Sequence, residues 1–552
     1  MRLIGPLEAG EPQRPSLDQA VDVGADADTR GTHTPIMPFR PAGLEFSRDD
    51  GSVRAGATTA AGVLAAAAGI ATSEGLAALL DLRESPVLSV GQSVISLTPG
   101  PVAEAIIGVV GTNDKPLAVA SVVVAILLLG AVVGRWWLTR RIAACAIVAV
   151  LTALAVGSVL SRSYASPQGV FAAVAGGVAL MGVLQVLLRE NEHATVDVSR
   201  RIFLRSAAVI ALATVIVGGA GQVLASRHRR RQSIEKVRAA LNLPSREAGG
   251  PAGTDLMIDG QEPWVTPNRD FYRIDTSLQA PLIDPADWSL RVHGMVDREL
   301  TLTYQDLLDR GLTDAWITIC CVSNGVGGDL IGNTVWGGVP IKGLLEEAGL
   351  QPGADALLST SEDGWTCGTP LDALTDGRNA LLALTMNGEP LPVAHGFPVR
   401  QVVPGLYGYV SATKWVTDWE VTRFADFQAY WTQRGWGERG PIKTQSRIDV
   451  PRANSTVSAG ASVIAGVAWA QHVGIQKVEV QVGDGAWREA TLGAAPTVDT
   501  WVQWSIEWDA EPGRQTIQVR ATDLTGATQT AEEVGVLPDG ATGWDEVNVL
   551  VK

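Results

Sequence analysis

The chain has 552 residues, enough for several domains, and 46% of them are hydrophobic while only 18% are charged. This composition is unusual for a soluble enzyme of such length and predicts a membrane-embedded portion. The formal net charge of −15 argues against a general nucleic-acid-binding protein, because such proteins need a basic surface to displace counterions from phosphates. Four cysteines, one of them (Cys145) inside an apolar run, exclude a disulfide framework and a four-thiolate metal site.

Residues 1–56 are acidic, rich in Gly, Pro, Asp and Thr, and lack sustained apolar periodicity. They predict a disordered cytoplasmic tail. No basic region followed by an apolar core occurs here, so a cleavable secretory signal is not expected.

Residues 57–226 form a region of long apolar runs, at roughly 57–80, 116–134, 142–160, 167–188 and 206–225. Each run approaches the ~20 residues with which a helix crosses a bilayer, so we expect about five spans. The stretch 87–111 is also apolar, but its Gln, Ser and central Pro-Gly-Pro favour an interfacial segment. Six spans are the alternative.

The short loops predict the orientation, because cytoplasmic loops collect Lys and Arg. One set of loops carries Arg135, Arg140, Arg141, Arg189, Arg200, Arg201 and Arg205. The opposite loops hold only Arg83, Lys115 and Arg162. The pattern predicts a multi-pass protein of the cell membrane whose N-terminus is inside and whose residues after 226 are extracytoplasmic. The basic stretch SRHRRRQ (226–232) opposes this orientation.

The sequence SRRIFLRSAAVIALATVIVGGAG (199–221) fits the twin-arginine export pattern SRRxFLK, with an apolar segment behind it. The residues in register are Ser199, Arg200, Arg201, Phe203, Leu204 and Arg205. Arginines that only fix the membrane topology are the alternative interpretation. The export route serves proteins that fold around a cofactor before crossing, which predicts a cofactor in the part that follows.

Residues 227–260 are expected to form a linker. Residues 261–445 mix short strand-like runs, such as AWITIC (315–320), with helical pieces such as IKGLLEEAG (341–349), which predicts an α+β domain. Another pattern begins at 446: KVEVQVGDGAWREATL (477–492) alternates across a turn at Asp484 and Gly485 and predicts a hairpin.

Further strands follow this hairpin at sandwich-like spacing, so residues 446–552 predict an all-β, immunoglobulin-like sandwich. The expected fold class is therefore multi-domain: an all-α transmembrane helical region, then an α+β domain, then the sandwich.

Two of the four cysteines, Cys320 and Cys321, end a β-branched run and precede a glycine-rich loop. Neighbouring side chains on a strand point to opposite faces, so we expect one thiol to pack and the other to face a site. A buried cysteine that packs as a small hydrophobe is the commoner alternative. Cys367, in DGWTCGTP, is expected to be a packed loop cysteine without a ligand role.

Three ordered blocks, CVSN (321–324), WGGVPIKGLL (336–345) and MNGEPLPVAHGFPVRQVVPGLYGYVSATKWV (386–416), resemble the sulfite oxidase family of molybdopterin enzymes. The resemblance covers roughly 260–552 and includes the sandwich, which is similar to that family's dimerisation domain. It implies a membrane-anchored bacterial oxidoreductase of the actinobacterial type with a molybdenum cofactor (molybdopterin and Mo) and two-electron oxo-transfer chemistry. A homodimer through 446–552 is a further implication.

In that family, a cysteine followed after two residues by asparagine supplies the thiolate ligand of molybdenum. The resemblance places this ligand at Cys321, with Asn324 in the asparagine position and Cys320 as the packing residue. Binding of an anionic pterin phosphate requires cationic and amide donors. The resemblance also assigns cofactor contacts to Asn268, Phe271, Tyr272, Arg273, His395, Arg400, Ser411, Thr413 and Lys414. Taken alone, Arg400 fits a strand salt bridge and His395 fits a capped core histidine.

The chain departs from true sulfite oxidases after the ligand cysteine, where those enzymes place arginines and this chain has the glycine-rich stretch 325–328. An anion pocket is therefore expected to draw on Arg269 or Arg273, and no catalytic side chain is assigned. Sulfite and sulfoxides of the methionine sulfoxide type remain open as substrates, as do the reaction direction and the electron partner. A non-enzymatic membrane-anchored binding module is the alternative from another class, and the retained Cys321 argues against it.

Haem is not expected in the membrane region, because a b-type haem there needs buried axial histidines. All six histidines lie outside the apolar runs: His33, His193, His228, His293, His395 and His472. An iron–sulfur cluster is not expected either, since the cysteine set for one is missing.

Overall fold

The computed structural model describes residues 49–99, 114–162, 165–188, 220–244 and 249–552, with Val102 and Ala208. Val53–Lys552 form one compact unit, and the other unit, Met1–Ser52, lies almost wholly outside the described residues. Most of the predicted tail, the twin-arginine motif at 199–205 and most of the fifth predicted span also lie outside them.

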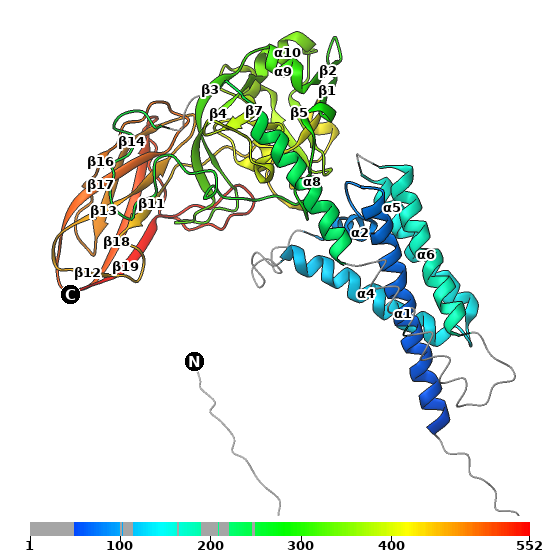
Figure 1. The fold of residues 1–552 in the computed structure, drawn as a ribbon. Coiled ribbons are helices and arrows are strands. Elements are labelled where there is room, and N and C mark those ends of the chain that lie inside the picture. The colour runs from blue at the N-terminus through cyan, green and yellow to red at the C-terminus, as the bar shows by residue number, and fades with distance from the viewer. Residues whose placement is uncertain are drawn as a thin grey trace, which may run out of the picture. The chain divides into compact units, whose positions relative to one another are not determined.

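Four helices of the described part of the chain are long and apolar enough to cross a membrane. They are α1 (Asp49–Leu79), α4 (Asp114–Trp136), α5 (Arg141–Leu160) and α6 (Pro167–Leu187) (Figure 1). These match four of the five predicted apolar runs and indicate membrane association. Helix α1 begins at Asp49, inside the segment that the sequence predicts as a tail.

Helices α1 and α4 pack through small residues. A Cβ atom added to Gly62 of α1 would lie 2.0 Å from the carbonyl oxygen of Gly130 and 2.8 Å from Cα of Gly134, both on α4. Glycines at these positions therefore let the two backbones approach closely, as is common between helices in membranes.

Two further helices flank this group. The apolar helix α2 (Pro86–Leu97) is too short to span a bilayer and is capped by Ser85, which is consistent with the interfacial prediction for that part of 87–111. Helix α8 (Ala220–Ala240) contains the basic stretch 226–232. The predicted linker is thus helical as far as Ala240, because Ile234 packs into a hydrophobic cluster of the following domain.

The next part of the chain is β-rich and contains two sheets. The first has the order β2-β1-β10-β5-β6, made of β1 (Ser289–Gly294), β2 (Leu300–Thr303), β5 (Ala356–Ser361), β6 (Thr366–Pro370) and β10 (Val416–Thr422). The second has the order β3-β4-β7-β8 with β9 on β7, made of β3 (Thr313–Cys320), β4 (Ile331–Pro340), β7 (Leu381–Met386), β8 (Glu389–Pro390) and β9 (Arg400–Val402).

Short helices connect these strands: α9 (Tyr304–Asp309), α10 (Ile341–Ala348), α11 (Leu371–Thr375) and α12 (Gly408–Ser411). Helix α9 starts with a capping box, in which Thr303 and Asp306 bond each other's backbone N–H groups. Buried rings such as Trp288, Trp415 and Trp419 belong to a hydrophobic core to which both sheets contribute. Cys367 packs in this region at 0% exposure, although it lies on strand β6 rather than in a loop.

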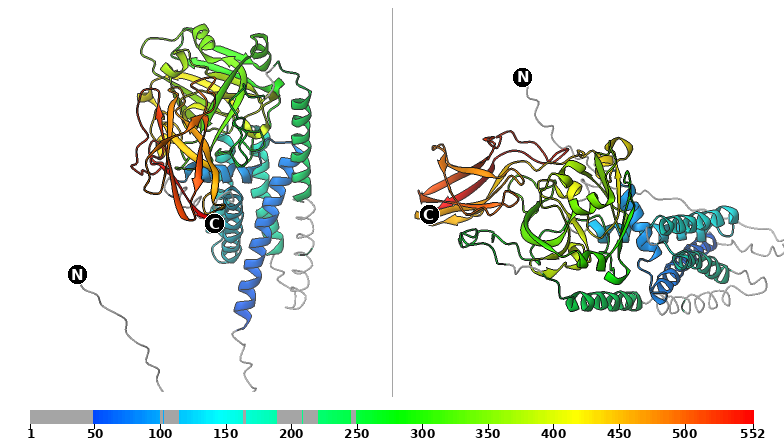
Figure 2. Two further views of the ribbon diagram at one scale, coloured as in Figure 1. Left: turned by 90° about the vertical axis from the view of Figure 1, so that its left-hand side faces the viewer. Right: turned by 90° about the horizontal axis from the view of Figure 1, so that it is seen from above.

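Two more sheets follow at the C-terminal end (Figure 2, orange to red). One has the order β11-β13-β17-β16, made of β11 (Gln445–Val450), β13 (Gly460–Trp469), β16 (Thr491–Leu492) and β17 (Val502–Ala510). The other has the order β12-β19-β18-β14-β15, made of β12 (Thr456–Val457), β14 (Ile475–Val482), β15 (Arg488–Glu489), β18 (Gly513–Asp523) and β19 (Asp545–Val551).

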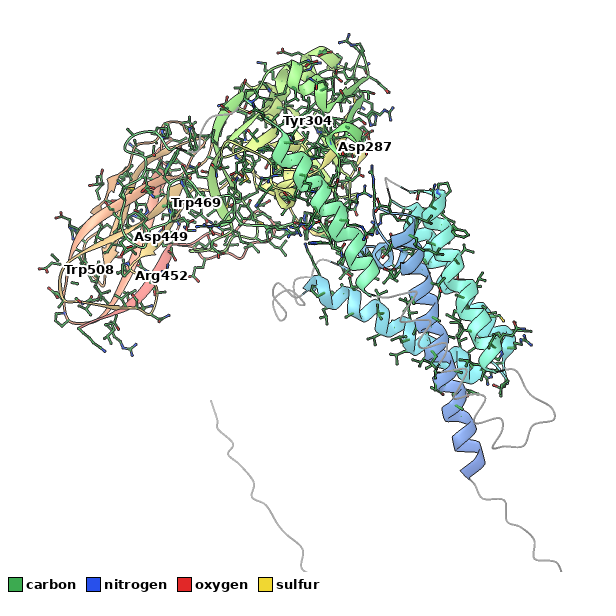
Figure 3. All side chains as sticks on the ribbon, in the orientation of Figure 1. Asp287, Tyr304, Asp449, Arg452, Trp469 and Trp508 are labelled. Atoms are coloured by element: carbon green, nitrogen blue, oxygen red, sulfur yellow. The ribbon has the colours of Figure 1, made fainter. Side chains whose placement is uncertain are left out.

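The predicted hairpin at Asp484 and Gly485 is confirmed, since β14 and β15 pair in antiparallel fashion on either side of it. Buried residues of both C-terminal sheets, such as Trp508 and Val519, share one hydrophobic cluster. Trp469, at the end of β13, instead joins the core of the β-rich domain (Figure 3).

Candidate active site

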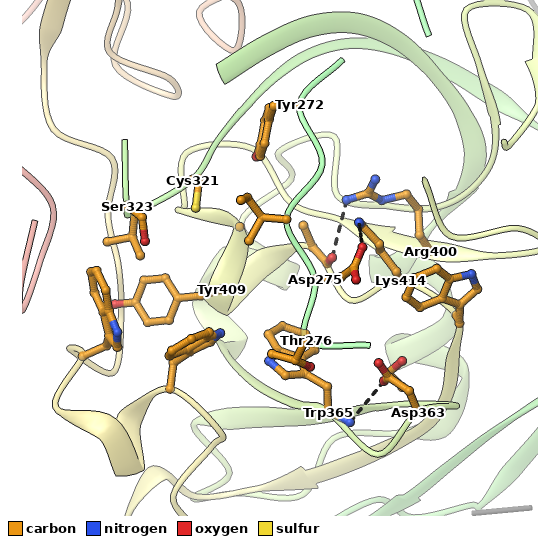
Figure 4. A pocket seen from close by; sticks show the side chains of 18 of the residues that line it. Tyr272, Asp275, Thr276, Cys321, Ser323, Asp363, Trp365, Arg400, Tyr409 and Lys414 are labelled. Atoms are coloured by element: carbon orange, nitrogen blue, oxygen red, sulfur yellow. Dashed lines mark hydrogen bonds and ion pairs between the residues drawn. The ribbon is translucent and has the colours of Figure 1, made fainter. Parts of the chain in front are cut away.

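A pocket of the β-rich domain collects several of the residues that the sequence singles out (Figure 4). The predicted residues on its wall are Phe271, Tyr272, Cys321, Arg400 and Lys414. Two carboxyl groups and a set of large rings complete the wall: Asp275, Asp363, Trp365, Tyr409, Trp415, Trp431 and Trp436.

Cys321 enters the pocket from the end of strand β3. Its backbone N–H donates to the carbonyl of Leu330 at 2.9 Å, and its own carbonyl accepts from the N–H of Asn324 at 3.1 Å, which turns the chain sharply after the strand. Cys320 is 1% exposed and belongs to the hydrophobic core. The two thiols therefore face opposite sides, as alternation along a strand requires.

Burial raises the pKa of both the Cys320 and the Cys321 thiols. A thiolate at Cys321 therefore needs a strong electrophilic partner, and a metal ion is one. Within the described residues, no group of three or more His, Cys, Asp or Glu side chains is arranged to hold a metal. A metal in this pocket would thus take one ligand from the protein and the others from a group that it brings along.

The loop after Cys321 is held from two directions. The side-chain Oδ1 of Asn324 accepts from the backbone N–H of Leu330 at 2.9 Å, closing the loop. Arg447 of β11 donates to the carbonyl of Gly328 at 2.9 Å. A Cβ on Gly328 would lie 2.5 Å from Asn324 Oδ1, so the glycine permits this closure.

Arg400 is a buried cation, 4% exposed, on strand β9. It donates to the carbonyl of His395 at 3.0 Å and its guanidinium lies 4.8 Å from the ring centre of Trp336. Its Nε has no hydrogen-bond partner, and none of the described carboxylates forms an ion pair with it. Burial lowers the pKa of Arg400 to about 10, which still leaves it charged at neutral pH. Burial of an unneutralised charge is costly, so an anion bound next to Arg400 would be stabilising.

Lys414, after helix α12, is a second buried cation beside the pocket. Its Nζ lies 3.2 Å from Oδ2 of Asp275 (Figure 4). The same carboxylate contacts Arg273 at 2.9 Å and Lys115 of helix α4 at 2.6 Å. Burial alone would raise the pKa of Asp275, but these cations, led by Lys414, hold it well below its usual range. Three cations around one carboxylate leave positive charge for an anionic ligand.

His395 does not line the pocket, but it lies next to Arg400 and Phe271 and is a neutral group. Burial, reinforced by the charges of Lys414 and Arg400, lowers the pKa of His395 to about 3. Phe271 meets the imidazole edge-on, with ring centres 5.8 Å apart, and stacks on Tyr272 at 5.4 Å. This part of the domain therefore combines charge with flat apolar surface.

Other predicted residues lie outside the pocket wall. Ser411 donates its hydroxyl to the carbonyls of Leu406 and Tyr407, and Thr413 is 0% exposed. Asn268 donates to the carbonyl of Met386 at 3.1 Å.

The two candidate substrate arginines are placed differently from the expectation. The side chain of Arg269 is 85% exposed and pairs with its neighbour Asp270, so it does not reach the pocket. Arg273 is 45% exposed and does not line the pocket, but it forms an ion pair with Asp275, which does. The cations that line the pocket are Arg400 and Lys414.

Sequence reasoning missed the two pocket carboxyls, the aromatic wall and Lys115. Asp275 follows Arg273 by two residues in the segment PNRDFYRID (267–275), which contains four of the predicted cofactor-contact residues, so its position was a usable signal. Lys115 gave none, because 160 residues separate it from Asp275 and only the fold brings them together.

The residues present fit a molybdenum cofactor. One pocket-facing thiol, a buried guanidinium without a carboxylate partner among the described residues and a surplus of cations around Asp275 match what a metal with an anionic organic ligand requires. The stacked rings of Phe271 and Tyr272 offer a flat apolar surface that suits a ring system.

Comparison with known proteins gives a family. Residues 277–431 match the family model described as oxidoreductase molybdopterin binding domain. The chain is 35% identical over 157 residues to the uncharacterized oxidoreductase YuiH of Bacillus subtilis, covering 28% of this chain and 76% of that protein. It is 27% identical over 303 residues to sulfite oxidase of Gallus gallus, covering 46% of this chain and 65% of that enzyme.

A solved structure, the sulfane dehydrogenase SoxCD from Paracoccus pantotrophus, matches 55% of this chain and 86% of its own with 23% identity and a TM-score of 0.47. The matched domain and the Bacillus subtilis relative together carry the assignment: the chain belongs to the sulfite oxidase family of molybdopterin-binding oxidoreductases and is an oxidoreductase with a molybdenum cofactor.

Proposed function

We propose that this protein is a membrane-anchored oxidoreductase that acts on a small sulfur compound in the pocket of Cys321. The observation that carries the proposal is one pocket-facing thiol beside two buried cations, Arg400 and Lys414. When bound, the molybdenum cofactor supplies two-electron chemistry in which an oxygen atom usually passes between the metal and the substrate.

The chain's own residues would hold that cofactor. Cys321 supplies the thiolate, and the turn closed by Asn324 fixes the direction of the thiol. Arg400 and Lys414 bind the anionic phosphate of the pterin, because both are buried and charged at neutral pH. Phe271 and Tyr272 offer flat surface to the rings.

A carboxyl on the pocket wall is suited to hold a proton. Asp363 accepts from the backbone N–H of Trp365 at 3.3 Å, and burial, together with the nearby Asp275, raises the pKa of Asp363. Oxidation of sulfite with water releases two protons and two electrons, and reduction of a sulfoxide to a thioether and water consumes both. Either direction requires a proton carrier at the site.

The outer wall of the pocket favours a sulfoxide as the second candidate substrate beside sulfite. It is aromatic: Tyr409 and Trp436 lie 5.9 Å apart, and Trp431 and Trp436 lie 6.3 Å apart, measured between ring centres. Rings provide apolar contact for the carbon substituents of a sulfoxide, whereas sulfite is a small dianion that needs cations. Arg400 is the one arginine among the residues that line the described pocket.

We further propose that the protein is multi-pass and presents the β-rich domain on the extracytoplasmic side. The four apolar helices, the loop arginines and the twin-arginine motif at 199–205 support this orientation. In the same proposal the chain is divided at 56, 226, 260 and 445, and 446–552 is an immunoglobulin-like sandwich through which two copies pair.

The test is elemental analysis for molybdenum and analysis for pterin on the purified full chain, made in a host that synthesises the cofactor, beside Cys321→Ser. We expect near-stoichiometric metal in the parent and a loss in the variant. Reduced-dye assays with methionine sulfoxide, and oxidant-linked assays with sulfite, then separate the two substrates. A well-folded parent that contains neither metal nor pterin would refute the oxidoreductase and leave the membrane-anchored binding module as the alternative function.

A further inference from the structure

We infer that the apolar helix α4 contributes to the catalytic pocket through Lys115, which keeps the pocket's cations available for an anionic ligand by sharing Asp275 with Lys414. The inference rests on the proposed function in that the ligand is the phosphate of the cofactor. Lys115 is a positioning residue here, because it acts on the site through Asp275.

The geometry around Asp275 shows how this sharing works. Oδ1 of Asp275 lies 2.6 Å from Lys115 Nζ, while Oδ2 takes Arg273 Nε at 2.9 Å and Lys414 Nζ at 3.2 Å. The Asp275 side chain is only 6% exposed and lines the pocket. The Lys115 contact is thus the shortest of three, and it occupies an oxygen of its own.

The net charge beside the pocket depends on how the two carboxylate oxygens of Asp275 are distributed among the three cations. Without Lys115, both oxygens of Asp275 would serve Lys414 and Arg273, and Lys414 would be more fully neutralised. With Lys115 present, three cations share one negative charge, and the surplus lies beside the pocket. A phosphate group carries more than one negative charge and makes charge-assisted hydrogen bonds with such donors.

The backbone of the same wall is also held by a helix of the apolar region. Gln92 of α2 donates to the carbonyl of Thr276 at 2.9 Å and accepts from the N–H of Leu278 at 2.9 Å. Residues 271–280 form no helix or strand. The regular backbone hydrogen bonds of a helix or a sheet therefore do not fix this segment. Lys115 therefore fixes the Asp275 side chain, and Gln92 fixes the backbone of Thr276 and Leu278, both from helices of the apolar region.

A second ion pair between the two regions provides a matched control. Arg83, in the loop between α1 and α2, pairs with Glu362 of the β-rich domain. Glu362 does not line the pocket, although it lies in the sequence next to Asp363, which does. Removal of Arg83 therefore tests attachment between the regions, whereas removal of Lys115 tests attachment and charge at the site.

The experiment uses the full chain in detergent as parent, Lys115→Met, Lys115→Arg and Arg83→Met, each checked for a monodisperse elution profile and its thermal unfolding midpoint. Molybdenum and pterin content are measured per protein. We expect Lys115→Met to retain roughly fivefold less of both than the parent, Lys115→Arg to match the parent, and Arg83→Met to stay close to it.

A second arm separates this inference from the proposed function. Protein made in a host without the cofactor is titrated with inorganic phosphate, and binding is followed by the shift in thermal midpoint. Parent and Lys115→Arg should bind phosphate more tightly than Lys115→Met. Equal phosphate binding by parent and Lys115→Met, no binding by the parent, or a loss in Arg83→Met as large as in Lys115→Met would overturn the role of Lys115. A parent that lacks metal and pterin but shows the phosphate difference would refute only the proposed function.

Discussion

Trp264 and Trp501 exchange hydrogen bonds, since the indole Nε1 of each donates to the backbone carbonyl of the other, at 3.2 and 2.9 Å. Both rings are 0% exposed. Trp501 leads into β17 of the C-terminal sheets, while Trp264 packs in the core of the β-rich domain. The backbone of Thr318, on β3, also pairs with this region, donating to the carbonyl of Asp499 at 2.9 Å. The two parts thus share a buried, hydrogen-bonded contact, called the joint below.

Trp501→Phe should lower the free energy of unfolding of both parts together by roughly 1–3 kcal/mol. The substitution removes the buried hydrogen bond from the Trp501 indole to the Trp264 carbonyl and part of the ring packing. Chemical unfolding followed by tryptophan fluorescence and by far-UV circular dichroism would measure this. Trp487→Phe, in the C-terminal sheets but outside the joint, is the control. Separate transitions for the two parts in the parent would show that the joint does not couple them.

The same substitution, Cys to Ser, should affect metal binding at Cys321 and stability at Cys320. Cys321→Ser should abolish molybdenum binding while leaving the unfolding midpoint close to that of the parent, because the side chain faces the pocket. Cys320→Ser should retain molybdenum but lose roughly 1–3 kcal/mol of stability, because it places a hydroxyl in the hydrophobic core. Metal content and urea unfolding of both variants check this, and the reverse pattern would assign the ligand to Cys320.

Lys414 predicts how anion binding depends on pH. Burial, opposed by Asp275, lowers the pKa of Lys414 to about 8. In protein free of cofactor, the ammonium is therefore present at pH 7 and lost as pH rises through about 8, so affinity for inorganic phosphate should fall between pH 7 and 9. Lys414→Arg should flatten this dependence, because a guanidinium stays charged. A phosphate affinity that is unchanged up to pH 9 in the parent would contradict the assignment.

Local patterns were readable in the sequence, and contacts between distant segments were not. The strand before Cys321, the hairpin at Asp484 and four apolar helices follow from periodicity and turn residues, which act over a few positions. The role of Asp275 depends on Lys115 and Lys414, which lie far from it in the chain. Helix α8 replaces part of the expected linker because Ile234 packs into a hydrophobic cluster. The other residues of that cluster are distant in the sequence, so the local pattern around Ile234 does not predict the contact.

His395 predicts a loss of stability in acid. Its pKa is about 3 in the folded protein because of burial and the neighbouring cations, against an ordinary value of 6.5. The unfolded chain therefore binds a proton that the folded chain does not, and stability falls as pH drops from 6.5 towards 3. At pH 5 the cost is up to roughly 2 kcal/mol. His395→Gln should lose less stability than the parent between pH 7 and 5 in urea unfolding, and an equal loss would refute this.

We expect the protonation of Asp363 to change the turnover rate with pH but to leave the molybdenum content unchanged. The groups that face it are Ser361, the N–H of Trp365, Asp275, Lys414 and Tyr430. Burial raises the pKa of Asp363 most, so the carboxyl holds its proton at a higher pH than an exposed aspartate does.

Asp363→Asn keeps the shape of the side chain but cannot exchange a proton. Turnover of methionine sulfoxide with a reduced dye should therefore fall by roughly 10²-fold, with little change in KM and full molybdenum content, while Asp363→Glu regains part of the rate. The rise in kcat as the parent's carboxyl protonates should also disappear from the pH profile of Asp363→Asn. If Asp363→Asn instead changes KM alone and keeps the parent's pH profile, the carboxyl shapes the pocket and another group carries the proton.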